Sequence, residues 1–191
     1  MPYDPRRHHR RSIRLKGYDY SLSGAYIITI CVHHGQCELG EIHNTEMQLS
    51  ACGNIVAATW ENLPDHYSCI ELDAFVVMPN HVHGIVVLVD VSTDTLPTAE
   101  TGPEPTLARN SHRHGLPEIV RAFKSFSARQ INQSKSIQGQ PFWQRNYYEH
   151  IIRNERAYLA IREYILSNPA NWGADKLNPV MPANQFNRYW R

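Results

Sequence analysis

Two histidines, His81 and His83, stand two residues apart at the start of an apolar run that ends at Val89. Side chains of an extended strand alternate between its faces, so both imidazoles project from the same side. Two imidazoles side by side on a rigid strand form a ready pair of ligands for a metal ion. A catalytic ion also needs a third protein ligand and open positions. The ordinary alternative is a pair of histidines with surface or core roles.

A second group of interest lies much later, where Tyr164 and Asn168 are four residues apart in a helix-like segment. That spacing puts them on one helix face, about a turn apart. A metal pair, a positioned tyrosine and a third polar ligand, which Asn168 could supply, suit phosphoryl-transfer chemistry. The ordinary alternatives are a core tyrosine with a tethered hydroxyl and a helix-terminal residue before Pro169.

The elements that must position these residues follow from the pattern along the chain. Strands are expected where β-branched and aromatic residues gather, namely 25–32, 37–42, 70–78 and from 81 onward. Helices are expected where apolar residues recur at helical spacing, namely 50–62, 117–132 and 155–168. Pro79-Asn80 turns the third strand into the histidine strand as an antiparallel hairpin. The order β, β, α, β, β, α, α predicts an α+β fold with an antiparallel sheet backed by helices.

The length of 191 residues suits one domain. We expect a basic arm over 1–16, a domain over 17–173 and a tail over 174–191, with an exposed Thr-, Pro-, Ser- and Gly-rich loop at 91–116. No apolar run approaches the ~20 residues of a membrane helix, and the N-terminus lacks the apolar centre of a signal peptide. A cytoplasmic protein without a membrane partner is therefore expected. The four cysteines include no CxxC pair, which argues against a zinc ribbon.

Charge is unevenly distributed along the chain, although the net charge is only +1. Residues 1–16 carry six Lys or Arg and one acid, and residues 17–107 carry twelve acids and no Lys or Arg. Residues 108–191 carry thirteen Lys or Arg and five acids. This segregation favours a polyanionic partner that contacts the arm and the C-terminal half. The alternative is an unevenly charged solvated surface, and composition does not choose between RNA, DNA and protein.

Four longer stretches of the sequence carry a resemblance to a known family. They are YDYSLSGAYIITIC at 18–31, FVVMPNHVHGIVVL at 75–88, GLPEIVRAFKSFSARQIN at 115–132 and FWQRNYYEHIIRNERAYLAIREYILSNPANWG at 142–173. In this order the chain resembles the single-tyrosine HUH transposases, especially the REP-associated tyrosine transposases and the related small insertion-sequence transposases. The resemblance covers most of the chain outside the arm, the 91–116 loop and the last residues.

The resemblance implies a ferredoxin-like α+β fold with the HUH single-tyrosine nuclease architecture. It implies that His81 and His83 bind Mg²⁺ or Mn²⁺, that Tyr164 is the nucleophile, and that Asn168 takes the place of a third ligand, where some relatives carry Gln. The implied activity is DNA transposition, by cleavage and strand transfer through a 5′-phosphotyrosine link. The implied substrate is single-stranded DNA with a hairpin. Monomer and homodimer both stay open, as does whether the tyrosine serves its own site or a partner's.

Several side chains are candidates for contacts with DNA. The basic candidates for phosphate contacts are Arg11, Arg14, Lys16, Arg121, Lys124, Arg129 and Arg153. Phe142, Trp143 and Tyr147 could stack on unpaired bases, although packing is the ordinary use of such residues. Two alternatives to a transposase stay open. One is a domesticated protein that binds hairpin DNA without moving it, and the other is a metal-dependent nuclease in which water attacks and Tyr164 is structural.

Overall fold

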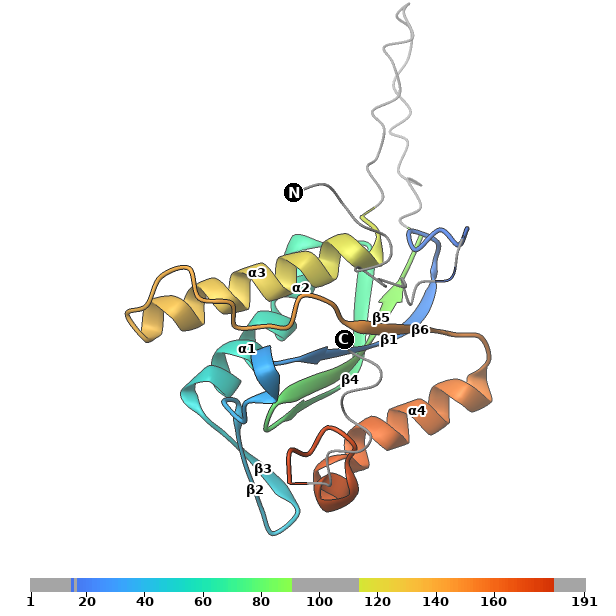
Figure 1. Ribbon diagram of the computed structural model, residues 1–191. Helices are drawn as coiled ribbons and strands as arrows, with labels where there is room; N and C mark the ends of the chain where they lie inside the picture. Colours follow the sequence, from blue (N-terminus) through green and yellow to red (C-terminus); the bar gives the residue numbers. More distant parts are fainter. Residues whose placement is uncertain (1–14, 16, 91–113, 181–191) are drawn as a thin grey trace, which may run out of the picture.

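A four-stranded antiparallel sheet forms the centre of the computed structural model, which describes residues 15, 17–90 and 114–180 (Figure 1). Its strands are β1 (Gly24–Cys31), β4 (Ile70–Met78), β5 (His81–Leu88) and β6 (Tyr148–Ile152), in the order β4-β5-β1-β6. A separate hairpin consists of β2 (Gly40–His43) and β3 (Glu46–Leu49). The basic arm with Arg11, Arg14 and Lys16, and nearly all of the expected loop, lie outside the described residues.

Helices cover both faces of this sheet. They are α1 (Ala51–Glu61), α2 (Leu63–His66), α3 (Leu116–Ser134) and α4 (Glu155–Ser167), and a 3-10 turn (Pro169–Ala174) follows α4. Figure 1 shows α1 and α3 on one side of the sheet and α4 on the other. The α+β class and the helix-packed antiparallel sheet predicted from the sequence are confirmed. Among the described residues no helix is long and apolar enough to cross a bilayer.

Alternation along the strands divides the apolar residues between two cores. Ile28 and Ile30 belong to the larger core, against α1 and α3, whereas the preceding residue Ile27 belongs to a smaller core beneath α4. On β5, Val82 belongs to the larger core and Ile85 to the smaller one. Odd-numbered positions of β5 therefore face α4. The two histidines stand at such positions, so the fold directs both toward the helix that carries Tyr164.

Gly84 allows α1 to lie close against the histidine strand. A Cβ at this position would come within 2.6 Å of the Trp60 indole. That indole also stacks on Phe75 of β4, with ring centroids 4.5 Å apart. Only glycine leaves room for this close approach, which fixes the side of β5 opposite the site.

Two element predictions need correction. The strand expected at 37–42 begins at Gly40 and pairs with β3 instead of returning along β1. A further strand, β6, lies between the two C-terminal helices where the sequence analysis expected no strand; it forms an edge of the sheet and pairs with β1. Strand β6 has only five residues, and its partner precedes it by more than a hundred positions. A strand this short, with a partner this far away in the sequence, has no local turn signal that would predict it.

Candidate active site

The two histidines on β5 form a buried pair whose Nε2 atoms face each other within hydrogen-bonding distance. His81 is fully buried, His83 is 4% exposed, and their Nε2 atoms lie 3.0 Å apart. Strand β5 lies between β1 and β4, so hydrogen bonds on both sides hold its backbone. The pair is therefore a rigid feature of the sheet, as the HxH spacing predicts.

A hydrogen bond at the opposite ring nitrogen fixes the tautomer of His81. Its Nδ1 lies 2.8 Å from the amide oxygen of Asn80. The Asn80 amide nitrogen donates to the carbonyls of Gly35 and Leu177, which fixes the amide with its oxygen toward the imidazole. Because an amide oxygen only accepts, Nδ1 of His81 carries the hydrogen and Nε2 of the neutral ring presents a lone pair.

Thr29 on β1 contacts Nδ1 of His83, as Asn80 contacts Nδ1 of His81. Its Oγ1 lies 2.8 Å from Nδ1 of His83, and the two residues are direct cross-strand partners. Burial, followed by the neighbouring His83, lowers the pKa of His81 well below its ordinary value. Burial alone lowers the pKa of His83 to about 4. Both imidazoles are therefore neutral at neutral pH, as metal ligands must be.

A carboxylate that the sequence analysis did not select completes this cluster. Asp175 ends the 3-10 turn after α4, and its Oδ1 accepts from the backbone N–H of Leu177 at 2.6 Å. Its Oδ2 lies 3.7 Å from Nε2 of His81 and is buried without a hydrogen-bond partner. Burial raises the pKa of this carboxyl. A buried carboxylate oxygen beside two neutral imidazoles is a donor set of the kind that binds a divalent cation.

Two of the three distances between the donor atoms fit a shared divalent ion. Two ligand atoms that are each ~2.1 Å from one ion cannot lie more than about 4.2 Å apart. The His81–His83 distance of 3.0 Å and the His81–Asp175 distance of 3.7 Å both meet that limit. One donor atom from each of the three side chains lies within 4.8 Å of the others. Two imidazoles and a carboxylate suit a transition ion such as Mn²⁺ better than Mg²⁺, which prefers oxygen ligands alone.

Tyr164 reaches the same cluster from α4. Its hydroxyl lies 3.5 Å from Nε2 of His83, and the two ring centroids are 5.4 Å apart. The residue is about half exposed, so the phenol borders both the histidines and solvent. Burial and the charge of Asp175 raise its pKa, whereas a hydrogen bond with Asn168 lowers it, and the net shift is upward. The phenol is therefore protonated at neutral pH.

Asn168, the third ligand expected from the sequence, lies one turn beyond Tyr164. It is 3% exposed, it ends α4, and its side chain hydrogen-bonds with the Tyr164 hydroxyl. Its Oδ1 is buried without a partner. Asn168 and Asp175 are thus two candidates for a third ligand. Asp175 is the one acidic residue of the sequence after Glu163, which is a signal that could have identified it.

Helix α4 is positioned by a cap and an apolar face. The side chain of Asn154 accepts from the backbone N–H of Ala157, as expected for an N-cap. Ile161 and the fully buried Ile165 pack on the smaller core against β5 and β6. Residues four apart on one face share these contacts, so the cap and the core together fix the rotation of the helix that presents Tyr164.

Polar contacts with β4 also hold α4. The hydroxyl of Tyr158 donates to Oδ2 of Asp73 at 2.5 Å, and Nε of Arg162 donates to Oδ1 of the same carboxylate at 3.1 Å. We call these three residues the α4 clamp. They join the tyrosine helix to the sheet of its own chain.

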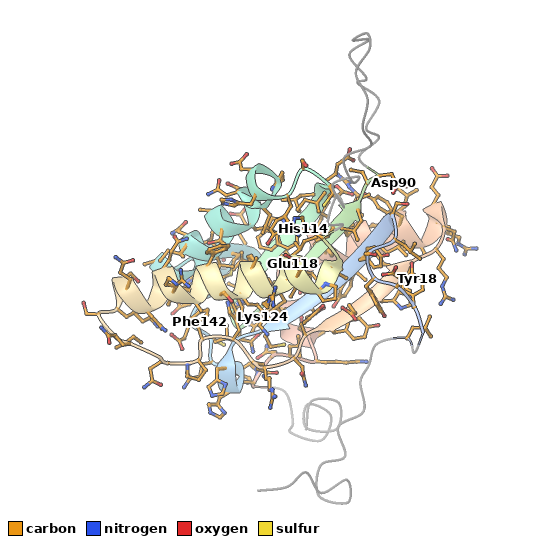
Figure 2. All side chains as sticks on the ribbon, turned by 90° about the horizontal axis from the view of Figure 1, so that it is seen from above. Tyr18, Asp90, His114, Glu118, Lys124 and Phe142 are labelled. Atoms are coloured by element: carbon orange, nitrogen blue, oxygen red, sulfur yellow. The ribbon has the colours of Figure 1, made fainter. Side chains whose placement is uncertain are left out.

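The basic candidates of α3 lie away from the histidine pair. Arg121 and Arg129 are exposed on α3, which packs on the other face of the sheet. Lys124 of the same helix donates to the carbonyls of Gln144 and Arg145, at 2.6 and 3.0 Å, and burial lowers its pKa to about 8 (Figure 2). Lys124 would contact a phosphate only if its hydrogen bonds to these two carbonyls were broken. Exposed Arg153 follows the end of β6 that pairs with Ala25, whereas the row of Thr29 and His83 meets the opposite end of β6.

Two of the aromatic residues considered for base stacking are core residues. Phe142 and Trp143 are each 6% exposed and belong to the larger core. The indole N–H of Trp143 also donates to the Ser127 hydroxyl at 2.9 Å. Partly buried Tyr147 packs against the same core. This arrangement agrees with the packing alternative for Phe142 and Trp143 and leaves neither ring available to unpaired bases.

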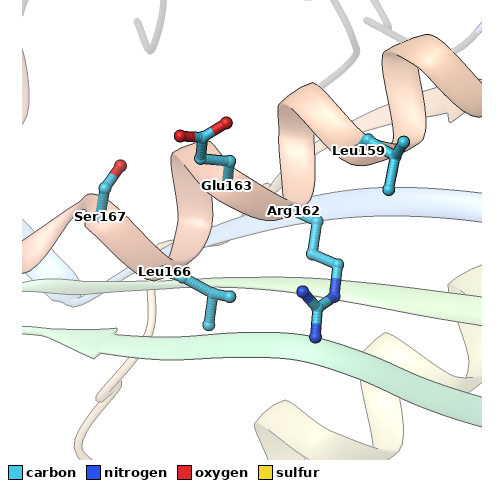
Figure 3. Close-up of a pocket in the computed structure, with 5 residues that line it drawn as sticks. All are labelled: Leu159, Arg162, Glu163, Leu166 and Ser167. Carbon is cyan, nitrogen blue, oxygen red and sulfur yellow. The ribbon is translucent and has the colours of Figure 1, made fainter.

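A hollow of about 550 Å³ runs along α4 (Figure 3). Its lining residues, all from α4, are Leu159, Arg162, Glu163, Leu166 and Ser167. Figure 3 shows the Arg162 side chain extending from the helix toward the sheet, where its Nε meets Asp73. No histidine lines this hollow, so it is separate from the candidate metal ligands.

Comparisons with known proteins agree with this fold. The sequence is 42% identical over 172 residues to an uncharacterised protein of Haemophilus influenzae, which covers 89% of this chain and 93% of that protein. No family model matches the sequence. The structure is similar to that of a REP-associated tyrosine transposase bound to a REP hairpin, with a TM-score of 0.52, 20% identity, and coverage of 85% of this chain and 77% of that one. At this identity the likeness is one of fold.

Proposed function

This chain belongs to one family with the Haemophilus influenzae protein, and we propose that it is a transposase that cleaves and rejoins single-stranded DNA through Tyr164. The observation that carries the proposal is the 3.5 Å approach of the Tyr164 hydroxyl to a histidine of the buried pair. A nucleophile beside neutral metal ligands is the arrangement that phosphodiester transfer needs. The fold shared with a REP-associated tyrosine transposase supports the same reaction class and a DNA hairpin as substrate.

The metal ligands in this proposal are His81 and His83, with a third ligand from Asp175 or Asn168. When bound, a divalent ion supplies Lewis-acid polarisation of a non-bridging phosphate oxygen. The chain itself fixes both imidazoles through Asn80 and Thr29, so neither ring must reorganise when the ion or the substrate binds. Mn²⁺ is the preferred ion because its ligand preferences include both nitrogen and oxygen.

Tyr164 acts as the nucleophile in the proposed first step. Its Oη forms a bond to the scissile phosphorus while the bond from phosphorus to the 3′-oxygen breaks. The phenol proton passes to solvent, and the departing 3′-oxygen takes up a proton to become a hydroxyl. The hydrogen bond from Asn168 favours the phenolate, whereas burial opposes it. The product is a 5′-phosphotyrosine link.

Strand transfer reverses this step with a different 3′-hydroxyl. That hydroxyl attacks the phosphotyrosine, the bond to the Tyr164 oxygen breaks, and the phenol regains a proton. One ester replaces another at each step, so the reaction needs no nucleotide cofactor. The sequence accordingly has no GxxxxGK[ST] phosphate loop.

A denaturing gel of the protein with labelled single-stranded hairpin DNA and Mn²⁺ tests this proposal. A covalent protein–DNA band is expected for the unaltered chain, and Tyr164→Phe should abolish it while hairpin binding persists. Tyr148→Phe is the matched control, because it removes a hydroxyl from another exposed tyrosine, and it should keep the band. Chelation of the metal and His83→Ala should each abolish the band.

Two outcomes would overturn the proposal in different ways. Cleavage without a covalent band, unaffected by Tyr164→Phe, would favour a nuclease in which water attacks. Tight hairpin binding with neither cleavage nor a covalent band would favour a domesticated binding protein.

Titration with Mn²⁺ separates the two candidate third ligands. Loss of a coordinating oxygen should weaken Mn²⁺ binding at least tenfold, by analogy with the 10–100-fold cost of losing a supporting contact at a metal site. Asp175→Ala and Asn168→Ala, which each remove the side-chain oxygen, are compared in the same titration. The variant that loses the larger affinity identifies the ligand.

A further inference from the structure

Tyr148 lies in the same cross-strand row as a histidine of the candidate site. Its direct partner on β1 is Thr29, whose direct partner on β5 is His83. Residues directly opposite in an antiparallel sheet project from the same face. Tyr148 therefore faces the α4 side of the sheet, two strand spacings or about 10 Å from His83.

The Tyr148 ring is open to solvent at this position. It is 40% exposed, and His150, the next residue of β6 on the same face, is exposed as well. Strand β6 is an edge of the sheet, and α4 begins beyond its far end. The row therefore runs from an exposed aromatic ring through Thr29 to the buried histidine pair. The exposed rings of Tyr148 and His150 therefore lie on the same face of the sheet as the place where we propose that the scissile phosphate binds.

The charge around β6 suits a nucleic acid strand. Arg145 precedes the strand, and Arg153 and Arg156 follow it, and all three are exposed. Glu155 is exposed nearby and offsets part of this charge, whereas Glu149 points to the opposite face and is buried. Cationic side chains at both ends of an exposed aromatic residue attract phosphates and leave the ring for a base.

We infer that Tyr148, with His150 beside it, is a stacking platform for an unpaired base of the single-stranded DNA substrate. The base belongs to a nucleotide that flanks the phosphate held at the histidine pair. This inference rests on the proposed function, and it assigns the base contact that Phe142 and Trp143 do not provide. Stacking on a ring tolerates any base, so the platform sets the path of the strand rather than its sequence.

Fluorescence of 2-aminopurine placed next to the cleavage position tests this inference. The Tyr164→Phe background prevents cleavage, so that binding alone is measured. Stacking on Tyr148 should quench the fluorophore, and Tyr148→Ala should remove the quench and weaken binding about tenfold, within the range for loss of one stacked base. Tyr148→Phe should keep both. Tyr148→Leu, which is large but not aromatic, should behave as alanine does.

Phe126→Ala is the matched control, because Phe126 is 42% exposed but lies on α3, across the sheet from the site. It should change neither the quench nor the affinity. Retained Mn²⁺ binding in each Tyr148 variant shows that the site is intact. Equal affinity and equal quench in Tyr148→Ala and Phe126→Ala would overturn the inference.

The covalent-band assay keeps the two hypotheses distinct. A covalent band from the unaltered chain, with no effect of Tyr148→Ala on binding, would overturn the platform and leave the proposed function standing. Binding that depends on Tyr148 without any covalent band would overturn the proposed function and leave the platform standing.

Discussion

Tyr158→Phe tests how the α4 clamp holds the tyrosine helix on the sheet. The substitution removes one hydroxyl, whose hydrogen bond to Asp73 is 2.5 Å long, and leaves the ring in place. A hydrogen bond to a charged group contributes about 1.5–3 kcal/mol net. Because the Asp73 side chain is 25% exposed, we expect the lower end of that range. The free energy of unfolding should fall by about 1.5 kcal/mol, which lowers Tm by about 3–6 °C in a chain of this size.

The pH dependence of this loss identifies the carboxylate as its origin. Burial raises the pKa of Asp73, but hydrogen bonds from Tyr158 and Arg162 outweigh burial, and the net pKa lies below the ordinary 3.8. A carboxyl with a lowered folded-state pKa stabilises the fold fully above its ordinary pKa and loses that contribution as pH falls through the folded value. The difference between the two proteins should therefore shrink below about pH 4.

Urea unfolding of both proteins at about pH 7 and about pH 3 measures this difference. Tyr148→Phe is the control, since its hydroxyl is at an exposed position, and it should change stability little. Hydrogen exchange should also become faster in α4 of Tyr158→Phe than in its α3. Equal unfolding free energies at neutral pH, or a loss of the same size at low pH, would refute the assigned role of the Asp73 carboxylate.

Three further predictions concern the site and its supports. Gly84→Ala should destabilise the fold by about 1–3 kcal/mol in urea unfolding, because the new methyl group meets the Trp60 ring; unchanged stability would contradict this close approach. Thr29→Val should weaken Mn²⁺ binding about 10–100-fold in calorimetric titration by removing the partner of His83 Nδ1, and an unchanged affinity would show that this contact does not orient the ring. Ile165→Ala should cost about 2–4 kcal/mol of unfolding free energy and speed exchange in α4, whereas a loss spread evenly over the chain would argue against a separate core beneath that helix.

Local spacing predicted the parts of the site that depend on one element. His81 and His83 share a strand face, and Tyr164 and Asn168 share a helix face, because strand and helix periods are properties of the backbone. The distance between Tyr164 and His83 is set by the way α4 packs on β4, β5 and β6. Spacing along the chain contains no information about that distance, although the family resemblance implied it.

The sequence analysis missed Asp175, the acidic member of the cluster, for a physical reason. Its side chain reaches His81 because the chain turns back after α4, and Asn80 bonds the carbonyl of Leu177 just beyond it. These contacts join residues nearly a hundred positions apart, so no local pattern marks them. A lone acidic residue in a basic C-terminal stretch was the available signal.

Aromatic residues near β6 show a similar limit. Composition predicts stacking from Phe142 and Trp143 as readily as from Tyr148, but the register of a short edge strand decides which ring is exposed. The same limit holds for charged residues: the ammonium group of Lys124 donates to two backbone carbonyls within the fold, which its residue type does not reveal. Counts of basic and aromatic residues therefore do not identify which of these side chains are available for contacts with a partner.

Fluorine NMR with Mn²⁺ tests most directly whether a metal ion binds beside the Tyr164 phenol. A fluorotyrosine at position 164 should lose its signal as paramagnetic Mn²⁺ is added. Tyr67 packs against the larger core, on the face of the sheet opposite α4, so a fluorotyrosine there should keep its signal at the same metal concentration. His83→Ala should restore the signal at position 164. Equal signals at both positions throughout the titration, or broadening at 164 that survives His83→Ala, would contradict the account.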